Sequence, residues 1–212
     1  MTVHAAAVAA RLIHRGIESD RLFSNLKLQK LVVLSQSFHL YRYGSPLIEE
    51  PVQAWKNGPV VKPLYGLYKE NADGPISAIA DTWKSNDVLP GASGDLVDSV
   101  WAEFSTMSAA QLWKLTHTYG PWEAVYQEGV ADIQIPNDAL AAAWKTYKNA
   151  AREMLGHHAV SRVAVDLNVA VGDEESREQI VIGSGQAGFV SASEYEDALS
   201  KFVPSRLTGR GI

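Results

Sequence analysis

One segment of this chain has the spacing of a nucleotide-binding loop. Gly183, Gly185 and Gly188 match the pattern G-x-G-x-x-G, in which glycine lets the backbone approach a pyrophosphate closely. A working dinucleotide site also needs a second parallel strand and, about 20 residues further on, an acidic residue that binds the ribose. Only 24 residues follow Gly188, and they contain no second strand pattern. The segment therefore predicts a glycine-rich turn, and we expect no nucleotide cofactor.

Histidine is the other residue type that could carry chemistry, as an acid, a base or a metal ligand. His157 and His158 are adjacent, so they do not share a helix face, whereas a metal-binding pair on a helix is spaced four residues apart. His117 could act as an acid or base beside a carboxylate. The chain has no cysteine and no G-x-S-x-G nucleophile motif. We expect no catalytic, cofactor-binding or metal-binding residue, and an enzyme using His117 stays an alternative.

The composition is that of a globular protein in water. Hydrophobic residues make up 46% of the chain and charged residues 20%, and no apolar run approaches the roughly 18 residues of a membrane span. The N-terminus lacks the basic and apolar regions of a signal peptide, so we expect a cytoplasmic location and no membrane partner. The net charge of −5 disfavours DNA as a partner. Residues 1–44 carry six basic and two acidic residues, which we interpret as a solvated helix face.

Helices must position any functional residues, because apolar residues recur at helical spacing through most of residues 1–155. The periodicity predicts helices over residues 4–16, 26–43, 95–107, 109–117 and 138–155. Ser108 and Gln111 have the spacing of a capping box, and Gly44 is expected to end a helix. Trp101, Trp113 and Trp144 lie among the apolar residues of these helices, so we expect them in the core.

Two Gly-Pro pairs, each close to a tryptophan, stand where helices are predicted to begin. Trp55 precedes Gly58-Pro59, and Trp122 follows Gly120-Pro121. Proline suits the first turn of a helix, where its missing N–H has no intrahelical partner. We therefore predict one helix that begins at Pro59 and a short one that begins at Pro121. Junctions of this kind often carry binding residues, and whether the two tryptophans pack on the core or face a partner stays open.

After residue 156 the pattern changes from helical to alternating. Valines alternate along residues 160–171, a second short strand is predicted over 179–182, and a capping box at 191–194 begins a helix. We expect a small β-hairpin and helix over residues 156–203 and a flexible tail over 204–212. The fold class is thus mainly α with a small α+β appendage. A hairpin with one helix is too small to be stable alone, so it should pack on the helical domain, on a partner or on a second copy, and a homodimer stays open.

Three sequence blocks, in their order and spacing, resemble the Panacea domain, a SocA-like antitoxin family. The blocks are Leu28-Gln29-Lys30-Leu31-Val32, Ala54-Trp55-Lys56-Asn57-Gly58-Pro59-Val60, and Leu112 with Thr116-His117 and Gly120-Pro121-Trp122. The resemblance covers about residues 5–155 and implies a compact multi-helix domain over residues 1–155 with no enzymatic activity of its own. It also implies a cognate protein toxin as the partner, neutralised by direct binding.

By the same resemblance, ten positions form the family's signature, and we call them the signature residues: Gln29, Lys30, Trp55, Gly58, Pro59, Val60, Thr116, His117, Pro121 and Trp122. The resemblance does not separate those that contact a toxin from those that hold the fold. A second mode in the family is an adaptor that delivers the toxin to a ClpXP-type protease, which the Arg- and Gly-containing tail after Pro204 would suit. The family's common aromatic is replaced at Val32-Val33, a mild change in core packing.

Overall fold

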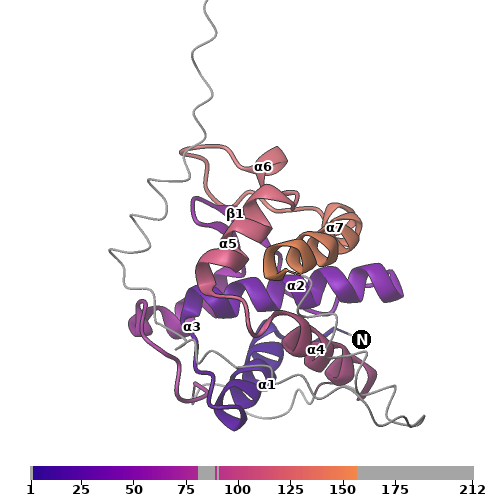
Figure 1. Cartoon of the computed structure of the whole chain (residues 1–212). Coiled ribbons are helices and arrows are strands. Elements are labelled where there is room, and N and C mark those ends of the chain that lie inside the picture. The colour runs from indigo at the N-terminus through magenta and orange to yellow at the C-terminus, as the bar shows by residue number, and fades with distance from the viewer. Residues whose placement is uncertain (1, 81–88, 90, 157–212) are drawn as a thin grey trace, which may run out of the picture. The chain divides into compact units, whose positions relative to one another are not determined.

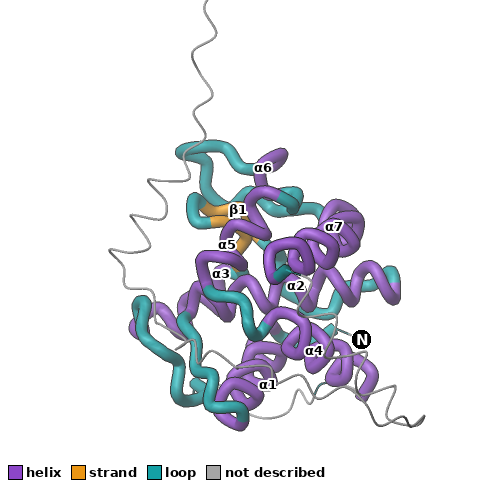
Figure 2. The backbone as a smooth tube through the Cα atoms, in the orientation of Figure 1, coloured by secondary structure: helices purple, strands orange, loops and turns teal. Residues whose placement is uncertain are grey.

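The computed structural model describes residues 2–80, 89 and 91–156. This part of the chain forms seven α-helices and one two-stranded antiparallel sheet, which confirms the mainly helical fold class (Figures 1 and 2). Within it, none of the helices is both long and apolar enough to cross a membrane. The glycine-rich turn, the paired histidines, the predicted C-terminal hairpin with its helix, and the tail fall outside the described residues, and the boundary at residue 155 stays a prediction.

Helix α2, Asn25–Tyr43, is the centre of the fold. It packs against α1 (Ala5–Glu18), α4 (Gly91–Phe104), α5 (Ala109–Thr118) and α7 (Asn137–Leu155). Figure 1 shows α2 running between α1 and α4 on one side and α5 and α7 on the other. The helix ends as predicted at Gly44, whose φ of +66° lies in the left-handed region that glycine tolerates. Because α2 has neighbours on several sides, most of its polar residues are buried too, and these build the site described below.

Aromatic side chains fill the core around α2. Trp144 stacks on Phe38 with ring centroids 4.3 Å apart and meets Phe104 at 5.9 Å, while Trp101 packs against Phe23 at 5.6 Å. Trp101 and Trp144 are buried as predicted. Trp113 is only half-buried, so the prediction that it lies in the core holds in part.

The first Gly-Pro pair lies in a β-hairpin, and the predicted helix start at Pro59 is wrong. Strand β1, Gln53–Trp55, pairs with β2, Gly58–Val60, and Ala54 lies opposite Pro59. Ala54 directs its own N–H away from β2, to the Ile133 carbonyl oxygen at 2.8 Å, so Pro59 occupies a position where no interstrand N–H is needed. Helix α3, Lys62–Tyr68, begins instead with Pro63 in its first turn and continues into the 3-10 turn η1, Lys69–Asn71.

The other local signals produce the elements they predict. Ser108 and Gln111 form both capping-box bonds, from the Gln111 N–H to Ser108 Oγ at 3.1 Å and from the Ser108 N–H to Gln111 Oε1 at 2.8 Å. The second Gly-Pro pair leads into α6, Trp122–Val125, with Pro121 at its N-cap. Far from these, Asp98 on α4 accepts bonds from Arg11 and Arg15 and so joins α4 to α1.

Candidate functional site

The structure brings the signature residues together where three elements meet. Gln29 and Lys30 lie in the first half of α2, the next four lie in the β1–β2 hairpin, and the last four lie at the end of α5 and the start of α6. Strand β2 packs on both α2 and α5. Figure 1 shows the hairpin, labelled at β1, beside α5.

Lys30 is a fully buried lysine under the turn of the hairpin. Its side chain is 0% exposed, and Nζ donates to the carbonyl oxygens of Asn57 at 2.7 Å and Pro59 at 3.1 Å. Burial lowers the pKa of Lys30 to about 7. The interpretation of the basic N-terminal stretch as a solvated face is therefore wrong at this position, because α2 lies in the middle of the fold.

Gln29, one residue earlier in α2, also hydrogen-bonds the backbone beside the hairpin. Its Oε1 accepts the Val61 N–H at 2.9 Å, and its Nε2 donates to Asn25 Oδ1 at 3.2 Å. Together Gln29 and Lys30 satisfy backbone groups of β2 and of the residues on either side of it, Asn57 and Val61. The two signature residues of α2 therefore hold the hairpin onto the helix.

Gly58 is required by a close approach from two sides. Its φ is +94°, and a Cβ placed on it would lie 2.5 Å from His117 Cε1 and 2.6 Å from Lys30 Nζ. Those distances are far below van der Waals contact, so any side chain at residue 58 would displace the buried side chains of His117 and Lys30. Gly58 is thus the point where the three elements touch.

Gly120 plays the equivalent part at the second Gly-Pro pair. A Cβ there would overlap the Tyr147 hydroxyl of α7 and lie 2.7 Å from the Thr116 carbonyl oxygen. Thr116 is itself buried, and its Oγ1 donates to the Leu112 carbonyl oxygen at 3.0 Å. The end of α5 can therefore approach α7 only because residue 120 has no side chain.

A hydrogen bond joins the two Gly-Pro junctions directly. The indole N–H of Trp122 donates to the Trp55 carbonyl oxygen at 2.8 Å, and the indole N–H of Trp55 donates to Gln53 Oε1 at 3.0 Å. Both rings are half-buried. Trp122 therefore joins the junctions with its N–H and Trp55 with its carbonyl oxygen, while part of each ring stays exposed.

These tryptophans belong to a larger group of rings, which we call the aromatic face: Trp55, Tyr65, Trp113, Trp122 and Tyr126. The ring of Trp122 stacks on Tyr126 at 4.7 Å and meets His117 at 4.1 Å, His117 meets Trp113 at 4.0 Å, and Trp55 meets Tyr65 at 5.3 Å. Tyr65 is 41% exposed, and the other four are half-buried. Sequence reasoning missed Tyr65 and Tyr126, although the spacing of Tyr126 four residues after Trp122 was a usable signal.

His117 has the surroundings of a packed histidine. It is buried between the rings of Trp113 and Trp122, and its Nδ1 lies 2.9 Å from the Trp113 carbonyl oxygen. Burial, and then the nearby charge of Lys30, lower the pKa of His117 to about 4, so the ring is neutral at pH 7. No carboxylate of the described residues hydrogen-bonds to it. This environment gives the alternative of a His117 enzyme no support.

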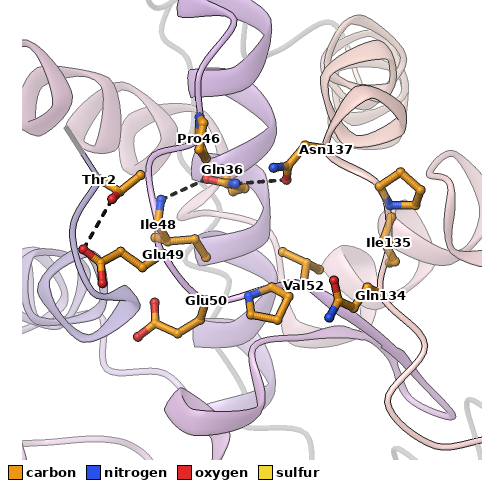
Figure 3. A pocket seen from close by; sticks show the side chains of 12 residues that line it. Thr2, Gln36, Pro46, Ile48, Glu49, Glu50, Val52, Gln134, Ile135 and Asn137 are labelled. Carbon is orange, nitrogen blue, oxygen red and sulfur yellow. Dashed lines mark hydrogen bonds between the residues drawn. The ribbon is translucent and has the colours of Figure 1, made fainter.

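A cavity of about 620 Å³ lies away from the signature residues, and Figure 3 shows its walls. Gln36 of α2 forms one wall, where its Oε1 accepts the N–H groups of Leu47 and Ile48 and its Nε2 donates to Asn137 Oδ1. Glu49 and Glu50 also line the cavity. Across the described ranges no group of histidine and carboxylate side chains is arranged to hold a metal ion.

Comparison with known proteins points to the same part of the chain. Residues 28–123, which include all ten signature residues, match the family model described as "Antitoxin SocA-like, Panacea domain". The chain is 32% identical over 136 residues to Antitoxin SocA of Caulobacter vibrioides (strain NA1000 / CB15N), an alignment that spans 58% of this chain and 71% of that protein. No solved structure matches the chain.

Proposed function

Because this chain belongs to the SocA-like Panacea antitoxin family, we propose that it is an antitoxin that neutralises a co-encoded protein toxin by binding to it directly. The observation that supports binding is the aromatic face, in which three half-buried tryptophans, half-buried Tyr126 and exposed Tyr65 lie among or beside the signature residues. Tryptophan and tyrosine contribute most to the binding energy of protein interfaces. We infer that this face contacts the toxin.

The way the face is built favours tight binding. Trp122 and Trp55 are held by hydrogen bonds from their indole N–H groups, and Trp122 is further fixed between His117 and Tyr126. Side chains that are already ordered lose little conformational entropy when a partner binds. The face therefore suits neutralisation by occupancy of the toxin surface.

Co-expression with the toxin encoded beside this gene tests the proposal. The expected result is rescue of growth together with co-purification of a complex. No rescue and no complex would contradict the proposal. A homodimer and a cytoplasmic location stay predictions. Delivery to a ClpXP-type protease also stays a prediction, since the tail that motivated it lies outside the described residues.

A pair of matched tyrosine variants tests the contact surface. Tyr65→Ala removes an exposed ring of the aromatic face, and Tyr41→Ala removes an equally exposed ring, 44% accessible, near the far end of α2. Both changes should leave the fold intact because both residues are exposed and neither belongs to the buried core. We expect Tyr65→Ala to weaken toxin binding by about tenfold or more and Tyr41→Ala to leave it unchanged, as measured by calorimetry. Equal affinities for the two variants would remove the aromatic face from the interface.

A further inference from the structure

Resting on the proposed function, we propose that the hairpin tip, defined as Lys56 and Asn57, is the element that selects the toxin. The buried signature residues present the tip in one fixed conformation, and the tip enters a depression on the toxin surface that carries a carboxylate. Most of the signature residues then support the hairpin, and Lys56 and Asn57 at its tip determine which toxin is bound.

The backbone on both sides of the tip is tied down by side chains from other elements. Lys30 bonds the carbonyl oxygens of Asn57 and Pro59, Trp122 bonds that of Trp55, and Gln29 bonds the N–H of Val61. A two-stranded hairpin alone is marginally stable in water. Here bonds from α2 and α6 fix it from both sides, so the tip is ordered before any partner arrives.

The tip also has no room to sink into the fold. Gly58, directly after the tip, already touches Lys30 and His117 so closely that a Cβ would not fit. Any inward movement of the turn would meet the same two side chains. The tip therefore stands outward against a rigid base, which suits insertion into a concave surface.

The side chains of the tip are unused by the fold. Lys56 and Asn57 are exposed, and with the rest of the described chain their side chains form no hydrogen bond or ion pair. Two neighbouring lysines differ in this respect, because Lys62 pairs with Asp132 at 2.8 Å and Lys69 with Glu70 at 3.6 Å. The ammonium group of Lys56 is thus available to a partner without breaking an internal ion pair.

The surroundings of the tip indicate the chemistry of the partner. Lys56 follows Trp55, whose ring contacts Tyr65, so a cation stands at the edge of an apolar aromatic surface. The complementary surface on a toxin is a carboxylate in an apolar depression. The exposed Glu123 and Glu128 near α6, with the net charge of −5, disfavour the phosphate backbone of a nucleic acid as the occupant.

The test compares charge reversals in the full chain with the purified toxin. Lys56→Glu should weaken binding by about tenfold or more, through both slower association and faster dissociation, and should reduce the dependence of binding on salt between about 50 and 300 mM. Lys69→Glu makes the same charge change on the 3-10 turn η1, outside the hairpin, and should change affinity by less than about twofold. A carboxylate-to-lysine variant of the toxin that restores binding to Lys56→Glu would identify the depression.

A second variant removes the tip side chains while keeping the turn. Lys56→Ala combined with Asn57→Ala truncates both side chains at Cβ. Neither position has a positive φ and Gly58 is kept, so the turn and the fold should persist. We expect this variant to lose binding to the toxin. Wild-type affinity in both tip variants, with binding lost in Tyr65→Ala, would overturn the role of the tip and leave the proposed function intact. A wild-type chain that binds no toxin, or that binds RNA through Lys56, would overturn both.

Discussion

At the scale of single residues, Lys30 shows how a buried amine can serve the fold in either charge state. Its pKa of about 7 means that a large share of the molecules carry a neutral amine at neutral pH. A neutral amine still has two N–H groups, and the two carbonyl oxygens of Asn57 and Pro59 are the two acceptors present. The hairpin can therefore stay bonded to α2 when Lys30 loses its proton.

The close contact between Gly120 and Tyr147 can be tested by changing each residue in turn. Gly120→Ala should lower the free energy of unfolding by about 1 to 3 kcal/mol, because its Cβ meets the Tyr147 hydroxyl and the Thr116 carbonyl oxygen. Tyr147→Phe should cost little, because the Tyr147 hydroxyl is buried without a hydrogen-bond partner.

The double variant completes the cycle. Gly120→Ala with Tyr147→Phe should recover part of the loss, since the hydroxyl no longer occupies the space of the new Cβ. Urea denaturation of the four proteins measures the coupling. Strict additivity of the two single changes would show that the backbone of α5, and not the hydroxyl, meets the new side chain.

At the scale of elements, signals that act within a few residues could be read from the sequence. The capping box at Ser108 and Gln111 and the helix end at Gly44 both formed where predicted, because each depends only on neighbours in the chain. Gly58-Pro59 looked like a helix start for the same local reason. Its actual place in a hairpin depends on Lys30 and Trp122, which are distant in sequence and invisible to a local rule.

The capping box makes a quantitative prediction for α5. Ser108→Ala should lower the free energy of unfolding by about 1 kcal/mol, because the Gln111 N–H loses its acceptor. Ser99→Ala is a matched control, since Ser99 is exposed and its hydroxyl bonds a carbonyl oxygen within α4, so its removal should cost less. Thermal denaturation followed by circular dichroism compares the two. A loss as large for Ser99→Ala as for Ser108→Ala would argue against a special role for the cap.

At the scale of the whole molecule, the signature residues of the candidate site could be named from the sequence, but their arrangement in space could not. The resemblance supplied the ten signature residues, and the structure places them at one junction of three elements. The charge of residues 1–44 predicted a solvated helix face, because a lysine normally carries its charge at the surface. Only the packing of α2 against four other helices explains why Lys30 is buried.

Global stability should depend on pH through His117. Its pKa falls from 6.5 to about 4 on folding, so the unfolded chain binds more protons between those values. The free energy of unfolding therefore rises with pH from about 4 to 6.5 and is lost as the solution is acidified. Urea denaturation at several pH values across this range measures how steeply the free energy of unfolding rises with pH. That dependence should be weaker for His117→Gln than for the wild type. An unchanged slope would mean that other groups cause the acid sensitivity.

The bond from Trp122 to the Trp55 carbonyl oxygen has a consequence for the timing of synthesis. Its partners are 67 residues apart, and the bonds from Lys30 to the hairpin already span 27 and 29. A nascent chain that has emerged from the ribosome only as far as the hairpin lacks Trp122, whose indole N–H binds the Trp55 carbonyl oxygen. The surface proposed to recognise a partner is therefore completed only after Trp122 has left the ribosome. A translation product truncated before Trp122 would contain all of α2 but not the complete recognition surface.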